Sequence, residues 1–334
     1  MKLFVLSDVH SFYEPMMAAL EKNGFDINNP DHHVVICGDL FDRGPDANKV
    51  FVFAKRMADE GRFNYVCGNH EELLFDCVKE IYSHRGISSH HISNGTLDTI
   101  MQFTGFNKYD LCGGTCNLSE FEQKIEPLLD FIVDNAVDYI EVGDYIFVHG
   151  WIPHNTYSGK VEENWRDGDW NSARWYNGMA AWHNGARIPG KTIICGHWHC
   201  SWGHSHLNQD RKEFPAKNRK DWKKSFKPFI DEGIIALDAR RAQALDLLDE
   251  VQRVHHDAIA DDAGLVRVED AAGDQAQDAL RALGDDRVAG VGAALVAHHV
   301  VGLVRQDVDD LALAFVAPLG PDQNRIHFSS IPRC

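Results

Sequence analysis

Five strand-like segments of the sequence are each followed closely by residues that can bind metal ions or phosphate. The segments are residues 3–6, 34–37, 64–67, 145–148 and 192–195, and the residues after them are Asp8, His10, Asp39, Asp42, Arg43, Asn69, His70, His149, His197 and His199. Each motif alone has an ordinary explanation, such as a capping aspartate or a turn glycine. Because ligands bind at the carboxyl ends of the strands in open α/β sheets, the five motifs together predict one shared site.

The residue types in these motifs indicate a particular chemistry. Oxygen ligands mixed with imidazoles, without thiolates, suit divalent ions such as Mn, Fe or Zn. The ligands are numerous enough for two ions, and Asp39 could bridge them. Two cations about 3.5–4 Å apart can clamp both oxygens of an in-line displacement at phosphorus and lower the pKa of a shared water. A guanidinium such as that of Arg43 can form paired hydrogen bonds to phosphate oxygens.

The elements that must position these residues follow from the hydrophobic pattern. Helical patterns at residues 13–22 and 47–60 separate the first three strands, which predicts a βαβαβ start. Further along, residues 139–148 (YIEVGDYIFV) predict a hairpin with Gly143 and Asp144 in its turn.

The middle of the chain contains one more helix and two insertions. Ser119 and Glu122 have the spacing of a capping box, which predicts a helix that starts there and contains Pro127. Residues 83–118 and 151–190 have the composition of insertions between the main elements.

Two motif spellings carry a resemblance to a known family. The stretches Gly38-Asp-x-x-Asp-Arg-Gly44 and Gly68-Asn-His-Glu71 closely resemble motifs of the calcineurin-like metallophosphoesterases. They are most similar to the bacterial and phage-type phosphoprotein phosphatases, the serine/threonine phosphatase-like branch, and the resemblance covers residues 1–239. It implies an α/β (α+β) fold, a β-sandwich flanked by helices, with a dinuclear metal site at the C-terminal ends of the strands.

The resemblance also implies a role for each motif residue. The implied ligands of the first metal are Asp8, His10 and Asp39, and those of the second are Asp39, Asn69, His149 and His197. His70 resembles the family's general acid, oriented by Asp42, and we expect the carboxylate of Asp42 to raise the pKa of His70. The implied substrate-binding residues are Arg43 and Asn69.

The sequence departs from the family pattern at three points. His199 is either a further metal ligand or a residue that supports the ligands. Arg174 is a candidate for a second phosphate-binding arginine, and the alternative is a structural arginine stacked on Trp170 or Trp175. Relatives follow the strand at residues 234–237 with one more strand, which this sequence lacks, so we expect an unpaired sheet edge there.

The last part of the chain differs in composition from the first 239 residues. Residues 240–334 are rich in Ala, Asp and Arg, and no aromatic residue occurs between residues 230 and 314. This tail is either a helical appendage or a non-native, frameshifted sequence. In both cases we expect loosely attached helices or disorder and no metal ligand from it.

Composition disfavours some classes of partner and indicates the cellular compartment. The formal net charge of −17 disfavours a general nucleic-acid-binding surface, and no apolar run approaches the 18 or so residues of a membrane span. The eight scattered cysteines fit free thiols in the cytoplasm, although Cys112 and Cys116 could be half of a zinc site.

The sequence predicts an enzyme and leaves its substrate open. The first hypothesis is hydrolysis of phosphomonoesters, on small molecules or on phosphoserine and phosphothreonine in proteins, with manganese as the expected metal. The alternatives are a nucleotide hydrolase of the diadenosine-tetraphosphatase kind and a phosphate-binding pseudoenzyme. A pseudoenzyme predicts a degenerate ligand, and every expected ligand type is present in the motifs.

Overall fold

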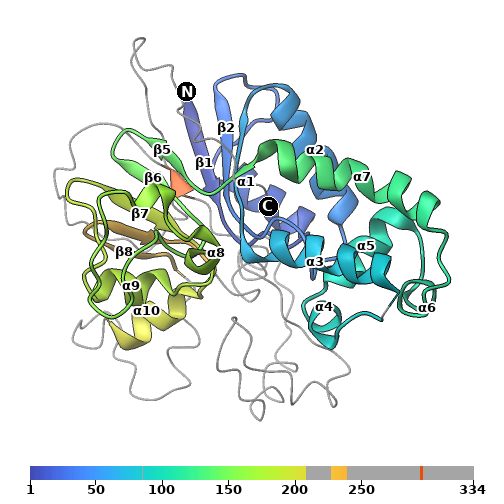
Figure 1. The fold of residues 1–334 in the computed structure, drawn as a ribbon. Helices are drawn as coiled ribbons and strands as arrows, with labels where there is room; N and C mark the ends of the chain where they lie inside the picture. The colour runs from blue at the N-terminus through green and yellow to red at the C-terminus, as the bar shows by residue number, and fades with distance from the viewer. Residues whose placement is uncertain (85, 208–226, 239–293, 296–334) are drawn as a thin grey trace, which may run out of the picture.

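The computed structural model describes residues 1–84, 86–207, 227–238 and 294–295, and these residues contain two five-stranded sheets (Figure 1). In spatial order the first sheet consists of β10 (Ala294–Leu295), β1 (Lys2–Leu6), β2 (His32–Cys37), β3 (Phe63–Val66) and β4 (Ala136–Val137). The second consists of β5 (Ile140–Val142), β6 (Tyr145–Phe147), β7 (Thr192–Cys195), β9 (Ile234–Ala236) and β8 (Phe229–Asp231).

The pairing within each sheet is mixed. Strands β1 to β4 run parallel, and β10 is antiparallel to β1. In the second sheet β6, β7 and β9 run parallel, while β5 and β8 are antiparallel to their neighbours. The parallel core of each sheet therefore brings the carboxyl ends of its strands to one edge.

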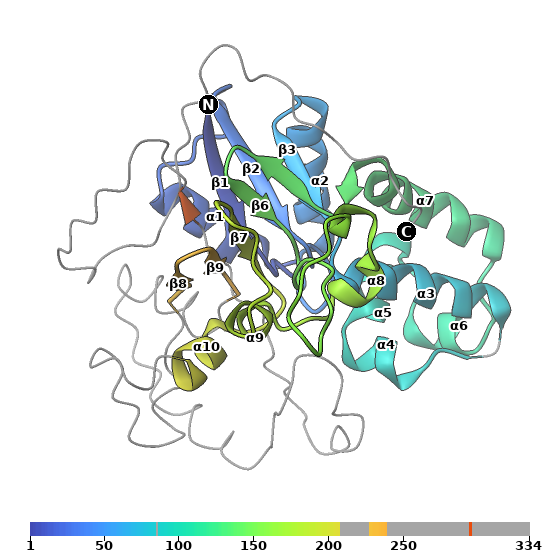
Figure 2. The same cartoon turned by 60° about the vertical axis from the view of Figure 1, so that its left-hand side comes forward.

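The two sheets pack face to face as a sandwich (Figure 2). Side chains of β1 alternate between the two faces of their sheet, as the period of a strand requires. Leu3 and Val5 are buried in a cluster with Phe147 and Ile194 of the second sheet. Phe4 points to the opposite face, in the cluster shared with the helices. The α/β sandwich expected from the sequence is confirmed.

Helices cover the outer faces of both sheets (Figures 1 and 2). On the first sheet these are α1 (Tyr13–Lys22), α2 (Ala47–Asp59) and α7 (Leu118–Asn135), and on the second they are α8 (Trp170–Ala173), α9 (Gly178–His183) and α10 (Cys200–His206). The 3₁₀ turn η1 (Trp165–Asp167) lies in the second insertion. The remaining helices, α3 (Asn69–Ser83), α4 (Ser89–Ser93), α5 (Thr96–Thr104) and α6 (Lys108–Cys112), gather near α7.

The local predictions largely agree with the structure. Every expected strand is present within one or two residues of its predicted bounds. The predicted hairpin is β5–β6, in which Val142 pairs with Tyr145 across the Gly143–Asp144 turn. The seven cysteines that lie among the described residues are all free thiols, Cys112 and Cys116 included.

The predicted capping box is wrong. The N-cap of α7 is Asn117, whose side-chain oxygen accepts from the backbone N–H groups of Ser119 at 3.1 Å and Glu120 at 3.3 Å. Asparagine caps a helix as well as serine does, so α7 begins earlier than expected. Pro127 lies inside α7, as predicted.

The expected unpaired edge at residues 234–237 is also wrong. Strand β9 lies between β7 and β8, because residues 229–231 form a short strand that pairs antiparallel with it, with Ile230 opposite Ile235. The sequence prediction missed β8 because three residues give too short a pattern.

The tail lies outside the described residues except for β10. Its two residues pair with β1, with Leu295 opposite Phe4 and Ala294 opposite Val5. This strand covers the backbone groups at the edge of β1, and the residues of the tail for which helices or disorder are expected lie outside the described residues. Among the described residues, no helix has both the length and the apolarity to cross a membrane.

Candidate metal centre

The motif residues meet in one pocket at the carboxyl ends of the strands. The described residues that line this pocket are Asp8, His10, Asp39, Arg43, Asn69, His70, His197, His199 and Asp238. His149 belongs to the same cluster, since its ring nitrogen lies with atoms of Asp39 and His197 in a possible ligand group. The structure thus brings together every predicted ligand of the two metals.

Tight turns of the backbone aim these side chains. Asp8, His10, Asp39 and His197 have positive φ angles of 53°, 47°, 55° and 66°. Non-glycine residues adopt this left-handed conformation at a cost, and it persists only where surrounding contacts enforce it. The loops after β1 and β2 supply such contacts, because the N–H of His10 donates to the carbonyl of Asp39 at 2.9 Å.

Asp39 lies between two groups of possible ligands. The first group consists of Asp39, His10 and His70. The second consists of Asp39, His149 and His197. Its Oδ2 atom lies 3.6 Å from Nε2 of His10, and its Oδ1 atom lies 3.3 Å from Nε2 of His149. One carboxylate therefore reaches both groups, as a bridging ligand must.

The imidazoles are oriented for metal binding. Nδ1 of His10 is hydrogen-bonded to the carbonyl of Phe41 at 3.0 Å, and Nδ1 of His149 to the carbonyl of Cys37 at 2.8 Å. These contacts leave Nε2 of each ring as the nitrogen on the pocket side. Nε2 of His197 is buried and has no hydrogen-bond partner among the described residues. A buried nitrogen without a partner fits a metal ligand.

The charges of the pocket also fit bound cations. Burial raises the pKa of Asp8, and the nearby carboxylate of Asp238 raises it further. Burial and then Glu71 raise the pKa of Asp39 in the same way. Burial lowers the pKa of His197, which keeps its ring neutral. Buried carboxylates that lie close together repel one another when ionised. A divalent cation bound between them and the neutral imidazoles would offset that repulsion.

Glu71 has a structural role that the sequence analysis did not assign. Its carboxylate accepts hydrogen bonds from three backbone N–H groups, those of Gly68 at 2.7 Å, Asp39 at 3.0 Å and Leu40 at 3.0 Å. It ties the start of α3 to the loop after β2, and so fixes the position of Asp39. Its place at the third position of α3, typical of a capping box, could have revealed this role.

Asp238 is a pocket residue that the sequence analysis missed. It follows β9 and is buried, and one of its carboxylate oxygens lies 3.1 Å from Nδ1 of His199. A polar residue directly after a strand was the pattern used for the other motifs, so the same pattern could have found Asp238.

His70 is held between Asp42 and Arg43. Its Nδ1 atom lies 2.7 Å from Oδ2 of Asp42, and its Nε2 atom lies 3.0 Å from a guanidinium nitrogen of Arg43. We expected the carboxylate of Asp42 to raise the pKa of His70. That expectation is wrong, because burial and then the Arg43 guanidinium lower this pKa. Burial raises the pKa of Asp42 to about 7, against the hydrogen bond from Thr96.

Arg174 is buried next to the pocket but is not among the residues that line it. Its guanidinium forms ion pairs with Glu72 of α3 and with Asp138, which precedes β5. In this structure it joins α8 to α3 and to the link between β4 and β5. Its role in phosphate binding stays a prediction, as does direct metal binding by His199.

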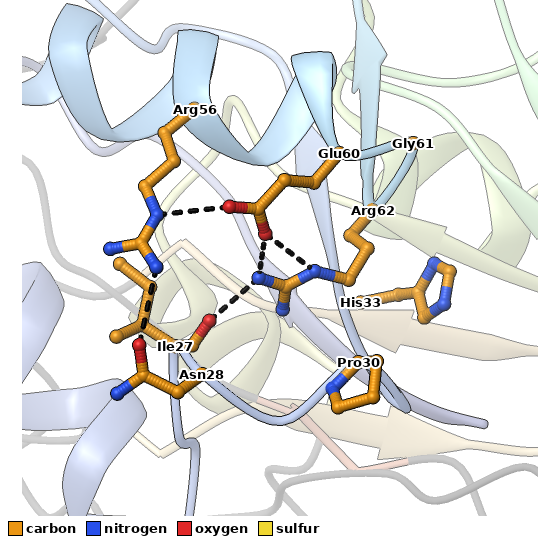
Figure 3. Close-up of a pocket in the computed structure, with 8 residues that line it drawn as sticks. All are labelled: Ile27, Asn28, Pro30, His33, Arg56, Glu60, Gly61 and Arg62. Atoms are coloured by element: carbon orange, nitrogen blue, oxygen red, sulfur yellow. Dashed lines mark hydrogen bonds and ion pairs between the residues drawn. The ribbon is translucent and has the colours of Figure 1, made fainter.

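A second cavity, larger than the metal-site pocket, is lined by charged residues that pair with one another (Figure 3). Its volume is about 490 Å³, and it lies where β2 and β3 begin, at the ends opposite to the metal centre. Arg62 donates there to Glu60 and to the backbone carbonyls of Ile27 and His32, and Arg56 donates to Glu60. These charges are paired within the protein and close a loop onto the sheet.

Comparison with known proteins agrees with the geometry of the pocket. The profile of the family described as calcineurin-like phosphoesterase matches residues 1–201. An asymmetrical bis(5'-nucleosyl)-tetraphosphatase of Bacillus velezensis is 33% identical over 81 residues, which are 22% of this chain and 32% of that protein. A symmetrical bis(5'-nucleosyl)-tetraphosphatase of Buchnera aphidicola is 34% identical over 94 residues, 28% of this chain and 31% of that protein. The chain thus spans about a third of the length of these curated relatives.

Among solved structures, a cold-active protein-tyrosine phosphatase of a Shewanella species is similar at 17% identity and a TM-score of 0.36. The match covers 70% of each chain.

Proposed function

Because the chain belongs to the calcineurin-like phosphoesterase family, we propose that it is a hydrolase of phosphoric esters that depends on two divalent metal ions. The observation that carries the proposal is the position of Asp39, whose two oxygens face His10 on one side and His149 on the other. Among the described residues, both sides offer carboxylate and imidazole groups, and the second also has the amide of Asn69, all of which divalent ions bind.

The residues of the chain divide between the two ions. Asp8, His10 and Asp39 would hold the first ion, and Asp39, Asn69, His149 and His197 would hold the second. When bound, the two ions polarise phosphate oxygens and make a nucleophile available from water at neutral pH. Manganese is the metal that we propose, with iron or zinc as alternatives.

Four residues of the chain bind the substrate, donate a proton to it or orient the proton donor. Arg43 binds phosphate oxygens through its guanidinium, beside Asn69. His70 donates a proton from Nε2 to the leaving oxygen, and Asp42 holds the ring by accepting from Nδ1. Arg43 donates to Nε2 of His70 in this structure. A bound phosphate would compete for the guanidinium, and Nε2 would then take up from solvent the proton that it passes to the leaving oxygen.

Two substrate classes fit the site. The first is phosphomonoesters, including phosphoserine and phosphothreonine in proteins, because in-line displacement at a single phosphate needs only the residues described. The second is dinucleoside tetraphosphates, and the names of the Bacillus and Buchnera relatives favour it. A pseudoenzyme predicts a missing ligand, and against it the candidate ligands line the described pocket or, for His149, lie in the ligand group beside it.

A substrate panel tests the proposal. We would measure hydrolysis of p-nitrophenyl phosphate, a phosphothreonine peptide and diadenosine tetraphosphate, with added Mn²⁺ and after removal of metal by a chelator. Metal-dependent turnover of any of the three supports the phosphoesterase, and the largest kcat/KM assigns the substrate class. Turnover that persists after complete metal removal, or no turnover of any substrate with metal bound, contradicts the proposal.

A further inference from the structure

Helix α5 of the first insertion holds the loop that contains Asp42 and Arg43. The hydroxyl of Thr99 accepts from the N–H of Asp42 at 3.0 Å. Gln102 accepts from the N–H of Ala47 at 2.9 Å and donates to the carbonyl of Gly44 at 2.9 Å. The helix therefore contacts this loop at both of its ends.

The loop needs such support because its backbone is strained. Asp42 and Arg43 are consecutive residues with φ angles of 75° and 60°. Two neighbouring non-glycine residues in the left-handed region persist only where surrounding contacts impose it. Gly95, just before α5, packs against them so closely that a Cβ atom there would lie 2.4 Å from the backbone nitrogen of Arg43.

Thr96, the first residue of α5, contacts the residues proposed for proton donation. Its hydroxyl donates to Oδ2 of Asp42 at 2.8 Å, and the same oxygen lies 2.7 Å from Nδ1 of His70. Thr96, Asp42 and His70 are all buried. The position of the Asp42 carboxylate, and through it the orientation of the His70 ring, therefore depends on a hydroxyl group of the insertion.

We propose that Thr96 is a positioning residue that, through Asp42, orients His70 for protonation of the leaving group. The inference rests on the proposed function, and it gives the inserted segment at residues 83–118 a part in the reaction. Without the Thr96 hydroxyl, Oδ2 of Asp42 loses a hydrogen-bond donor, and the carboxylate that orients the His70 ring is held less tightly.

The experiment compares Thr96→Val with Thr104→Val. Thr104 is on the same helix, is equally buried, and donates its hydroxyl to the carbonyl of Ile100 at 2.7 Å, away from the loop. We would measure kcat on an alkyl phosphate and on p-nitrophenyl phosphate, bound manganese per chain and the melting temperature. Alkyl esters need protonation of the leaving oxygen far more than nitrophenyl esters do.

We expect Thr96→Val to lower kcat on the alkyl ester about tenfold, with less than about a twofold loss on the nitrophenyl ester. Its metal content should equal that of the wild type, Thr104→Val should change neither ester, and Thr96→Ser should restore the alkyl activity. Equal losses on both esters, or a loss in Thr96→Ser equal to that in Thr96→Val, would show a packing role and overturn the inference. If the metal-loaded wild type hydrolyses neither these esters nor diadenosine tetraphosphate, the proposed function fails and takes this inference with it. Turnover of diadenosine tetraphosphate alone would keep the proposed function and overturn this inference.

Discussion

Nδ1 of His199 lies 3.1 Å from a carboxylate oxygen of Asp238, a buried residue that follows β9. This contact leaves Nε2 as the other ring nitrogen of a histidine that lines the metal pocket. A carboxylate beside one ring nitrogen of a histidine restricts the direction of the ring. Asp238 thus completes the set of strand-end residues at this edge of the sandwich.

The first prediction is that Asp238→Asn weakens metal binding about 10- to 100-fold, because the substitution removes the charge that supports His199. Isothermal titration with Mn²⁺ measures the change. Asp144→Asn, in the exposed turn between β5 and β6, is the matched control and should bind as the wild type does. Unchanged affinity in Asp238→Asn would show that the contact with His199 has no part in metal binding.

The second prediction is that Asp39→Asn removes most activity and much of the bound metal, since both ions lose the carboxylate that they share. We expect kcat to fall by several orders of magnitude, on the order of 10³-fold or more. Metal analysis and steady-state kinetics measure the two effects, with Asp134→Asn on the exposed side of α7 as the control. A variant that keeps near-normal turnover would contradict the dinuclear proposal.

The third prediction separates proton donation from phosphate binding. His70→Asn should lower kcat mainly on alkyl phosphates, because a nitrophenolate leaves without a proton. Arg43→Ala should mainly raise KM, because its guanidinium binds the phosphate group. Steady-state kinetics on both ester types measure the difference. Equal losses of kcat on the two esters in His70→Asn would argue against His70 as the acid.

The fourth prediction concerns pH. In the metal-free protein, burial raises the pKa values of Asp8 and Asp39. The carboxylate of Asp238 raises the pKa of Asp8 further, and that of Glu71 raises the pKa of Asp39 further. The stability that these groups contribute is therefore complete below their unfolded pKa of about 4 and is lost as the pH rises through the raised values.

Bound cations should offset that loss because they favour the ionised carboxylates. The difference in melting temperature between the Mn²⁺-loaded and metal-free protein should therefore widen between about pH 5 and about pH 8. Calorimetry at several pH values measures it. A difference that shrinks as the pH rises would contradict the assignment of these carboxylates to the metal site.

The fifth prediction is that truncation after Ala239 leaves metal content and kcat nearly unchanged. Every described residue that lines the pocket precedes that position. The truncation removes β10 and exposes the edge of β1, which should reduce solubility because an unpaired edge can pair with other chains. Size-exclusion chromatography and activity assays measure both effects. Loss of activity in truncated protein that stays soluble and folded would make the tail part of the enzyme.

The sequence by itself predicted the candidate metal ligands and determined where the strands end. Asp8, Asp39 and His197 follow short apolar runs, and that pattern is local, so it can be recognised without knowing how the chain folds. The alternation of Leu3, Phe4 and Val5 between two buried faces follows from the period of a strand in the same way.

Only the tertiary structure decided which atoms meet across the site. The N–H of His197 donates to Asp8, 189 positions earlier in the chain, and Thr96 donates to Asp42, 54 positions earlier. The direction of the His70 pKa shift also needed the structure, because burial and the place of Arg43 decided it. Such contacts arise from the packing of segments far apart in the chain. Local sequence indicates the candidate ligands, but their hydrogen bonds, burial and charge depend on neighbours that folding brings together.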